Sequence, residues 1–361
     1  MTTAISYGFF RDNSRLSVSR LCVILILSAA FLIAGAGLIR TAKAETLNIY
    51  SYRSPQLLQP LLDAYTDETG VSFRVLQLKK GMAQRLEAEG ENTEADIALT
   101  VDISRLSELD NLGLLAAVDS KILNKNIPEH LRDPDSKWFA LSTRARVAVV
   151  SVDRVDTSKL KRIEDLADKH WQGRVCTRKG SHAYNRSLLA SIIAHNGQAS
   201  AQEWAAALVA NMSRKPQGND RAQANAIYSG QCDVALMNTY YYGLMSNNMD
   251  KIEQQEWAKA TRIVFLNQGD GDRGQHVNIS GAGILETSKN YDAAVAFLEW
   301  LSEPKAQRIY SSTNYEYPVN PAVEPDDEIK SWGSFRADSL FVEDLSDAAP
   351  AAQRIINIVG W

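Results

Sequence analysis

Three strand patterns lie near the start of the chain, at Glu45-Thr-Leu-Asn-Ile-Tyr-Ser-Tyr52, Val71-Ser-Phe-Arg-Val-Leu-Gln77 and Asp96-Ile-Ala-Leu-Thr-Val101. The first two alternate apolar and polar residues with a period of two, and the third is a short apolar run of the kind found in buried parallel strands. Between them, apolar residues recur at helical spacing over 57–65 and again over 82–90. The order strand, helix, strand, helix, strand predicts an α/β layer built on a parallel sheet.

Two longer patterns indicate that the chain crosses between two such layers. Trp138–Ser151 reads as one long strand that can leave one lobe and enter another, and Asn278–Leu285 is a strand of small residues that can return. This is the layout of a hinged binding protein with two α/β lobes, which would close about the crossing strands near Arg146 and Asn278. We place lobe 1 at 45–145 and 277–320, lobe 2 at 146–276, and a C-terminal helical segment that packs on lobe 2 at 321–361.

The first 44 residues have the composition of a secretory signal. Three arginines precede an apolar run over 21–39, and Ala42-Lys-Ala44 stands directly before Glu45. A basic flank, an apolar segment and an Ala-x-Ala end predict cleavage after Ala44 and export to the periplasm. The alternative is an uncleaved membrane anchor, because ~18 or more apolar residues can span a bilayer.

The charge and cysteine content narrow the class of protein further. The chain is 45% hydrophobic and 23% charged, which is ordinary for a globular protein, and beyond residue 44 it carries 34 basic and 42 acidic groups, a net charge of −8. This balance argues against a nucleic-acid partner and is compatible with the collection of cations. Two cysteines remain beyond residue 44, Cys176 and Cys232. An even pair in an exported protein favours a disulfide, with two separate buried thiols as the alternative.

Three consecutive tyrosines, in Asn238-Thr-Tyr-Tyr-Tyr-Gly243, follow an apolar run over 234–237. Where a strand turns into a helix, consecutive side chains can point at one place, so two adjacent phenols can meet at one site. A phenol has an ordinary pKa near ~10 and ionises at neutral pH only beside a strong charge such as a metal ion. The phenolate is a hard oxygen donor, which suits ferric iron better than zinc or copper(I). The alternative is that the rings only pack in the core or at its rim.

A further tyrosine follows another strand. Tyr184 comes after the strand pattern at 173–177 and a polar loop, just as Tyr240 and Tyr241 come after the strand pattern at 232–237. In open α/β sheets, ligands bind at the carboxyl ends of the strands. We therefore expect these tyrosines at the ligand-binding edge.

Eight segments are distinctive in their order along the chain: Tyr50-Ser-Tyr-Arg53, Leu99-Thr-Val-Asp-Ile-Ser-Arg105, Trp138-Phe-Ala-Leu-Ser-Thr-Arg-Ala-Arg-Val147, Ser181-His-Ala-Tyr-Asn185, Lys215-Pro-Gln-Gly218, Asn238-Thr-Tyr-Tyr-Tyr-Gly243, Asn278-Ile-Ser-Gly-Ala-Gly283 and Asn314-Tyr-Glu-Tyr-Pro-Val319. Together they closely resemble the periplasmic ferric-ion-binding proteins of bacterial ABC iron importers. The resemblance covers the chain from Glu45 to its end.

The resemblance implies a fold, a ligand and partners. The fold is the transferrin-like type II periplasmic-binding-protein fold, an α/β Venus flytrap in which each of two lobes is a mixed sheet flanked by helices. Ferric iron would lie in the cleft between the lobes on phenolates that match Tyr184, Tyr240 and Tyr241, with Tyr242 as a neighbour. The protein would then be a monomer without catalytic activity, the binding subunit that delivers iron to an ABC permease and its ATPase.

The chain departs from some branches of that family at Ser54-Pro55, where those branches have a His-Tyr pair. Two or three coordination positions are therefore left open, and in branches without the pair a small anion such as carbonate or bicarbonate fills them. Arg53 and Arg144 are the candidates for holding this anion, because a guanidinium presents paired donors to a planar oxyanion. Arg146 is the substitute, and for either of the two candidates a plain salt bridge is the alternative.

Two rival functions remain open. The same fold can bind another small solute, such as an oxyanion or a polyamine, at a site that needs no converging tyrosines. The second rival is an enzyme, but the five histidines lack metal-ligand spacing, and the chain has neither a Gly-x-Ser-x-Gly elbow nor a P-loop. We interpret His182 as a solvent-facing loop residue, 215–220 as a surface turn and 315–319 as a loop.

Overall fold

The structure is a computed structural model that describes Met1 and residues 45–361, except for the side chains of residues 342 and 343. The predicted signal segment, 1–44, therefore lies outside the described residues apart from its first one. Among the described helices, none combines the length and the apolar composition that a bilayer span needs. Residues 45–361 form one unit.

Nine strands form a mixed sheet within residues 45–361: β1 (Thr46–Ser51), β2 (Ser72–Gln77), β3 (Ile97–Thr100), β4 (Phe139–Ser151), β5 (Val175–Cys176), β6 (Val234–Asn238), β7 (Thr261–Val264), β8 (Val277–Ile284) and β9 (Tyr317–Pro318). The main path has the order β2-β1-β3-β8-β4-β6-β5, and β7 and β9 each pair with β4. Pairs β1–β2, β1–β3 and β5–β6 are parallel, whereas the pairs that β4 and β8 make are antiparallel.

One strand, β4, belongs to both halves of this sheet. Its residues 139–145 pair with β8 in the first half, and residues 146–151 pair with β6 and β7 in the second. Arg144 lies opposite Asn278 of β8 and Arg146 lies opposite Asn238 of β6, so the strand changes partners between the two arginines. The long crossing strand predicted from the sequence is therefore confirmed.

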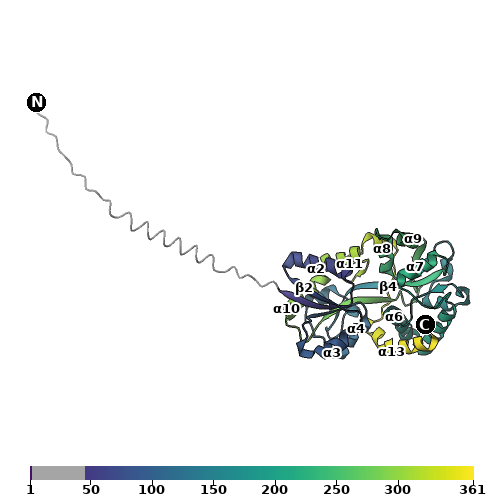
Figure 1. Cartoon of the computed structure of the whole chain (residues 1–361), viewed down its shortest axis with the longest axis horizontal. Coiled ribbons are helices and arrows are strands. Elements are labelled where there is room, and N and C mark those ends of the chain that lie inside the picture. The colour runs from purple at the N-terminus through teal and green to yellow at the C-terminus, as the bar shows by residue number, and fades with distance from the viewer. Residues whose placement is uncertain (2–44) are drawn as a thin grey trace. The chain divides into compact units, whose positions relative to one another are not determined.

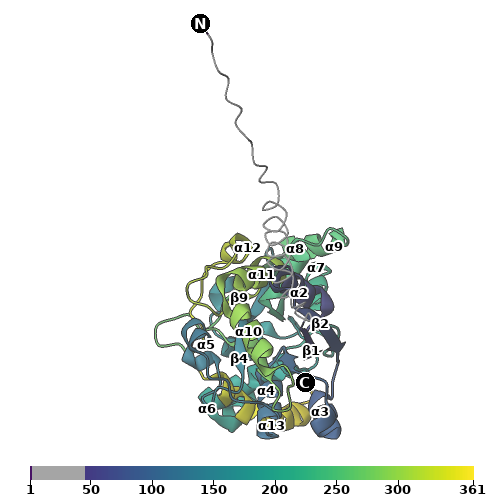
Figure 2. The ribbon, with the colours of Figure 1, turned by 90° about the vertical axis from the view of Figure 1, so that its left-hand side faces the viewer.

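Helices cover both halves of the sheet. The first half carries α2 (Pro55–Thr69), α3 (Met82–Glu89), α4 (Ile103–Asn111), α5 (Lys121–Asn126), α10 (Tyr291–Ser302) and α11 (Pro304–Asn314). The second half carries α6 (Ala183–Ala210), α7 (Asp220–Tyr228), α8 (Thr239–Ser246) and α9 (Ile252–Lys259), and the chain ends with α12 (Asp327–Ser331) and α13 (Val342–Val359). Figure 1 shows α2, α3 and α10 on one side of this unit and α7, α8 and α9 on the other, with β4 between them. In the end-on view of Figure 2, α2, α8, α9 and α11 lie near one edge and α3, α4 and α13 near the opposite edge.

Each half has its own hydrophobic core. In the first half, Leu47 of β1 and Phe297 of α10 belong to one cluster of buried side chains. In the second half, Leu236 and Met237 of β6 belong to two separate clusters, because successive residues of a strand point to opposite faces of the sheet. The C-terminal helix α13 packs along α6 and also contacts α4 of the first half.

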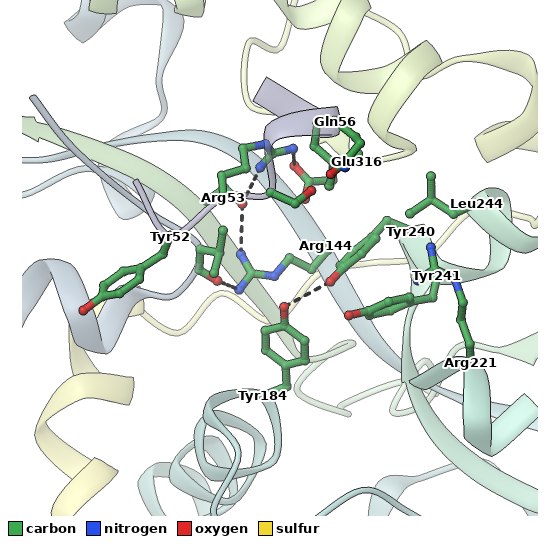
Figure 3. A pocket seen from close by; sticks show the side chains of 14 residues that line it. Tyr52, Arg53, Gln56, Arg144, Tyr184, Arg221, Tyr240, Tyr241, Leu244 and Glu316 are labelled. Atoms are coloured by element: carbon green, nitrogen blue, oxygen red, sulfur yellow. Dashed lines mark hydrogen bonds and ion pairs between the residues drawn. The ribbon is translucent and has the colours of Figure 1, made fainter. Parts of the chain in front are cut away.

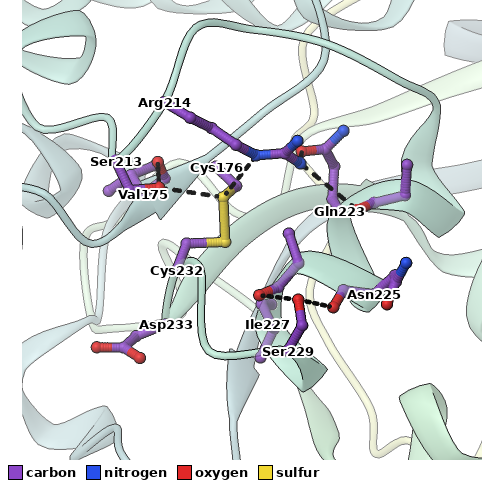
Figure 4. Close-up of a disulfide and its surroundings, with 12 residues drawn as sticks. Val175, Cys176, Ser213, Arg214, Gln223, Asn225, Ile227, Ser229, Cys232 and Asp233 are labelled. Atoms are coloured by element: carbon purple, nitrogen blue, oxygen red, sulfur yellow. Dashed lines mark hydrogen bonds between the residues drawn. A yellow bond between two sulfur atoms is a disulfide. The ribbon is translucent and has the colours of Figure 1, made fainter.

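A disulfide joins Cys176 of β5 to Cys232, which lies two residues before β6 (Figure 4). Both residues are buried, and the Nε atom of Arg214 lies 3.5 Å from the Cys176 sulfur. The favoured pairing is therefore present, and the alternative of two separate thiols is wrong. Because β6 leads directly to the three tyrosines, the bond fastens the start of that strand to its parallel neighbour.

The structure agrees with the helices predicted before and after residue 197 and disagrees with the loop predicted at 315–319. The two helices expected around 187–194 and 201–212 correspond to the two parts of α6, which ends at Ala210. The helix is interrupted between them at Gly197, where φ is 79°, a value that favours glycine. In contrast, the predicted loop at 315–319 contains β9, which pairs with Ser142 and Thr143 of β4. That loop prediction was wrong, because two residues carry no periodicity and the pairing comes from a distant part of the chain.

Candidate functional site

The candidate tyrosines stand where two parallel strands lead into helices. β6 ends at Asn238 in an extended conformation, and α8 begins at the next residue, so Tyr240 and Tyr241 lie in its first turn. Tyr184 is the second residue of α6, after the loop that follows β5. Since β5 and β6 are parallel neighbours, their carboxyl ends bring the three side chains to one edge of the sheet, as the sequence predicts.

The three phenols converge on one space. The hydroxyl oxygens of Tyr184 and Tyr240 lie 3.0 Å apart. The rings of Tyr240 and Tyr241 stack with centroids 4.3 Å apart. Figure 3 shows the hydroxyl ends of all three pointing toward one space beside Arg144. Together with Arg53 and Arg144 they line a cavity of about 490 Å³, the tyrosine cavity.

Tyr242 takes no part in this convergence. Its hydroxyl donates to the carbonyl oxygens of Ala258 and Thr261, at 3.2 and 3.0 Å. Its ring meets the edge of Trp332 with centroids 6.0 Å apart. The alternative interpretation, that the rings only pack against other residues, therefore holds for Tyr242, the third residue of the triplet.

Burial keeps the phenols of Tyr240 and Tyr241 neutral in the absence of a cation. It raises the pKa of Tyr240 well above the ordinary value of a phenol, and the neighbouring phenols Tyr184 and Tyr241 raise it further. Burial likewise raises the pKa of Tyr241 to about 12. Ionisation at neutral pH therefore requires a strong positive charge at the hydroxyls.

The two predicted anion-binding arginines both line the tyrosine cavity but have different partners. Arg53 is 1% exposed and forms an ion pair with Glu316 at 2.8 Å, and its Nε atom has no hydrogen-bond partner. Arg144 donates to the carbonyl oxygen of Val101 and lies 3.5 Å from the hydroxyl of Ser280. Among the side chains that the structure describes, no carboxylate forms a salt bridge with Arg144, so its charge is available to a ligand.

The substitute arginine, Arg146, uses its guanidinium group in contacts with other residues of the protein and does not line the tyrosine cavity. It pairs with Asp220 at 2.8 Å and donates to the side-chain oxygens of Asn185 and Asn238. Asp220 has no exposed surface and also pairs with Arg178 at 3.1 Å. Our interpretation of 215–220 as a surface turn was therefore wrong at its last residue, because two guanidinium groups compensate the buried carboxylate.

His182 is a helix cap. Its Nδ1 atom accepts a hydrogen bond from the backbone N–H of Tyr184 at 3.3 Å, and its half-buried ring meets the Tyr184 ring edge-on at 4.5 Å. Burial and the nearby arginines lower its pKa to about 3, so the imidazole is neutral. The interpretation of His182 as a solvent-facing loop residue was wrong, because its half-buried side chain caps α6. Such a cap forms only when the helix folds.

The residues of the tyrosine cavity that the sequence interpretation missed include Gln56, Arg221 and Glu316. The guanidinium carbon of Arg221 lies 5.2 Å from the centroid of the Tyr241 ring. Gln56 is the second residue of α2, and its N-cap Ser54, which makes no side-chain cap, also lines the cavity. The positive end of this helix dipole therefore lies at the cavity. The Ser-Pro pair in the sequence indicates the N-terminus of α2. No neighbouring residues in the sequence indicate that Arg221 and Glu316 line the cavity.

The cavity offers phenol oxygens on one side and guanidinium donors on the other. In the part of the chain whose side chains are described, no three His, Cys, Asp or Glu residues are grouped so that they could hold a metal ion. The oxygen groups that converge in this cavity are the three phenols, since the Glu316 carboxylate that also lines it is paired with Arg53. Such hard oxygen donors suit a small, highly charged cation.

The chain is similar to proteins of known structure and name. Its residues 92–336 match the family described as bacterial extracellular solute-binding protein. Iron uptake protein A2 of Synechocystis is 40% identical over 321 residues, which cover 89% of this chain and 91% of that protein. Ferric iron-binding protein A of Mannheimia haemolytica, solved in an open conformation, is 42% identical with a TM-score of 0.81 over 88% of this chain and 99% of that chain. The Trichodesmium protein solved with iron and citrate ligands is 38% identical with a TM-score of 0.82 over the same shares, 88% and 99%. These similarities confirm the predicted two-lobed α/β fold.

Proposed function

The chain belongs to the bacterial extracellular solute-binding proteins, and we propose that it binds ferric iron in the tyrosine cavity and delivers it to an ABC permease. The observation that carries this proposal is the approach of the Tyr184 and Tyr240 hydroxyls to 3.0 Å, with Tyr241 stacked beside them. The names of its relatives, which refer to iron uptake and ferric iron binding, support it.

Tyr184, Tyr240 and Tyr241 are the proposed ligands of the iron, as phenolates. Their hydroxyls face one space, so a single ion can replace the protons of all three. Three phenolates balance the charge of a trivalent cation, which a buried site requires. Hard, anionic oxygen donors without a histidine favour the ferric over the ferrous ion.

Arg53 and Arg144 are the proposed holders of an anion that completes the shell, such as carbonate or bicarbonate. Both line the tyrosine cavity, and Ser280 accepts a hydrogen bond from Arg53 at 3.0 Å while it lies 3.5 Å from Arg144. The N-terminus of α2 lies at the same cavity, at the Ser54-Pro55 position where other branches carry a His-Tyr pair. A helix N-terminus and two guanidinium groups all favour negative charge there.

Transport follows from closure of the two lobes. We assign lobe 1 to 45–145 and 277–320, lobe 2 to 146–276, and the C-terminal segment on lobe 2 to 321–361. Rotation about β4 and β8, the crossing strands, encloses the ion and presents the closed form to the permease and its ATPase. In this role the protein is an exported, periplasmic monomer with no catalytic activity.

A second candidate ligand is an oxyanion without iron. Arg144 has no partner among the described carboxylates, and Arg221 adds a further positive charge at the cavity. The same charges oppose a polyamine. An oxyanion alone does not need the three converging phenols, so tyrosine variants distinguish the two functions.

The test is a visible absorption titration of the purified exported protein with ferric citrate, with and without bicarbonate. We expect a phenolate-to-iron charge-transfer band that saturates at one ion per chain and is absent from a Tyr240→Phe/Tyr241→Phe variant. A band that does not depend on bicarbonate would remove carbonate as the co-ligand. A wild-type protein that stays colourless and binds no iron would refute the ferric assignment.

A further inference from the structure

The helix that carries Tyr240 and Tyr241 meets the first half of the protein at Gly243. Figure 1 and Figure 2 both show α8 beside α11, and the ring of Tyr315, the C-cap of α11, lies against Gly243. A Cβ atom at Gly243 would lie 2.7 Å from Cδ1 and 2.8 Å from Cβ of Tyr315, and closer still to Cγ. Carbon atoms that are not bonded prefer separations of about 3.5–4.0 Å, so the ring can lie on the backbone of α8 only because residue 243 is glycine.

This contact lies on the face of α8 that carries Tyr240. Gly243 follows Tyr240 by three positions, and residues three apart lie on one face of a helix. Tyr240 lines the tyrosine cavity, whereas neither Gly243 nor Tyr315 lines it. A shift of α8 away from the Tyr315 ring would therefore move the Tyr240 hydroxyl, which lies 3.0 Å from the hydroxyl of Tyr184 on α6.

Tyr315 has a backbone conformation that is uncommon for a bulky residue. Its φ is 56° and its ψ is 34°, in the left-handed region that favours glycine and asparagine. A tyrosine in this region is strained and persists only where the surrounding structure holds it there. Glycine or asparagine would end α11 with less strain, so the end of the helix does not itself require a tyrosine at this position.

The residues on either side of Tyr315 fasten it to the first half of the protein. The side-chain amide of Asn314 donates to the backbone carbonyl of Leu57 in α2 at 2.9 Å. Glu316 pairs with Arg53 at 2.8 Å, and β9, which begins at the next residue, pairs with β4. The backbone of Tyr315 is therefore held in place, and α8 packs against a ring that extends from it.

The two consecutive residues Tyr315 and Glu316 contact the groups on the two sides of the tyrosine cavity. Tyr315 contacts the helix that carries Tyr240, and Glu316 pairs with Arg53 on the other side. Because consecutive residues cannot move independently, the distance from the phenols to Arg53 depends on how closely α8 approaches the Tyr315 ring. A binding site needs its groups placed to within about 0.5 Å, so this packing contact bears on the binding of the ion.

We propose that Tyr315 is a positioning residue of the iron site, whose ring, packed on Gly243, sets the place of α8 and thereby of the Tyr240 and Tyr241 hydroxyls. The effect on iron affinity rests on the proposed function. The packing contact itself does not, because its contribution to folding is measured on the iron-free protein.

The experiment is a double-mutant cycle of Gly243→Ala and Tyr315→Asn in the purified exported protein. Gly243→Ala places a methyl group against the ring, although alanine is the better helix former. Tyr315→Asn removes the ring and supplies a residue that suits the left-handed backbone. Tyr315→Phe keeps the ring, and Ser246→Ala is the control for a substitution in the same helix. Competition with a chelator for ferric iron measures affinity, and urea titration of the iron-free protein measures stability.

We expect Gly243→Ala to lower the affinity for iron about ten- to a hundredfold, the loss that follows when a residue supporting a metal ligand is disturbed. In the Tyr315→Asn background the same change should alter affinity by less than about twofold, because no ring is left for the methyl group to displace. Tyr315→Asn alone should weaken iron binding about tenfold. Tyr315→Phe and Ser246→Ala should match the wild type. In urea, Gly243→Ala should lower the unfolding midpoint only where the ring is present.

Equal losses of iron affinity from Gly243→Ala in both backgrounds would overturn the proposal, because the effect would then arise within α8. A change in the urea midpoint without a change in iron affinity would also overturn it, since the contact would serve folding alone. If Gly243→Ala does not fold, Tyr315→Asn and Tyr315→Phe decide, and equal affinities of these two variants would contradict the positioning role. Failure of the proposed function is seen separately, as wild-type protein that shows no charge-transfer band with ferric citrate.

Discussion

Two buried arginine–carboxylate pairs lie near the tyrosine cavity, and their guanidinium groups differ in how many of their N–H donors have a partner. Arg146 pairs with Asp220 and donates its other N–H groups to two asparagines and a backbone carbonyl. Arg53 pairs with Glu316, yet its Nε has no partner and the residue lines the cavity. A guanidinium paired with a carboxylate therefore lines the cavity in one case, at Arg53, and lies outside its lining in the other, at Arg146.

This difference divides the cavity into two walls. The phenol wall consists of Tyr184, Tyr240 and Tyr241, and the arginine wall consists of Arg53 and Arg144. The first supplies oxygen donors that must lose protons to bind a cation, and the second supplies donors whose charge is permanent. A cation and its accompanying anion can thus be held by different walls.

The largest effect is expected from Asp220→Asn, which removes the support of the phenol wall. Arg146 and Arg178 would both lose their buried counter-charge. We expect the free energy of unfolding to fall by about 3–5 kcal/mol in urea titrations, because an uncompensated charge is left in the interior. Asp327→Asn, at an exposed ion pair, is the control and should change stability by less than about 0.5 kcal/mol. Similar small losses for both variants would contradict the account.

The next effect is the pH dependence of iron binding. It distinguishes the two walls because the phenol wall must release protons when iron binds and the arginine wall does not. Burial raises the pKa of Tyr240 and Tyr241, so these phenols are protonated before iron arrives. Binding three phenolates releases three protons, so affinity falls as pH falls, by about a thousandfold per pH unit or ~4 kcal/mol. Chelator competition at fixed free ferric ion activity measures this slope. A slope near zero would mean that the phenols are not the ligands.

A smaller and opposite effect is expected from Glu316→Gln in the arginine wall. This change frees Arg53 for the anion, so bicarbonate should bind about five- to tenfold more tightly, while stability falls by about 1–3 kcal/mol. Bicarbonate titrations of the iron-loaded protein, read by visible absorption, measure the first quantity. Glu94→Gln, at an exposed residue, is the matched control. Unchanged bicarbonate affinity would remove Arg53 from the anion site.

The smallest effect is expected from Tyr242→Phe, within the triplet but outside the phenol wall. The change removes hydrogen bonds to the carbonyls of Ala258 and Thr261, so stability should fall by about 0.5–1.5 kcal/mol. Iron affinity should stay the same in chelator competition. Loss of iron binding on this change would overturn the division between Tyr242 and its two neighbours.

Features with a local pattern could be predicted from the sequence. The strand pattern over 138–151 predicts one long strand, and the position of the tyrosines after β5 and β6 predicts that they meet at one edge. The disulfide followed from the even number of cysteines in an exported chain. In each case the signal lies within a few residues or in a simple count.

Features made by distant partners could not be predicted in this way. Asp220 is buried because Arg146 and Arg178 lie beside it, and its own neighbours in sequence are typical of a turn. His182 caps α6, and the polar residues around it in the sequence do not predict this role. The pairing of Arg53 with Glu316 joins residues 263 positions apart in the sequence. These contacts depend on tertiary structure, which local patterns do not contain.

The central claim is that three phenolates, and not the fourth tyrosine of the region, hold the ion. Resonance Raman spectroscopy of the iron-loaded protein, excited in its visible band, tests this most directly because it enhances only the vibrations of iron-bound phenolates. We predict that Tyr184→Phe, Tyr240→Phe and Tyr241→Phe each reduce or abolish these bands and that Tyr242→Phe leaves them unchanged. Wild-type protein that binds iron without phenolate bands, or bands that keep their full intensity in all three single variants, would contradict the account.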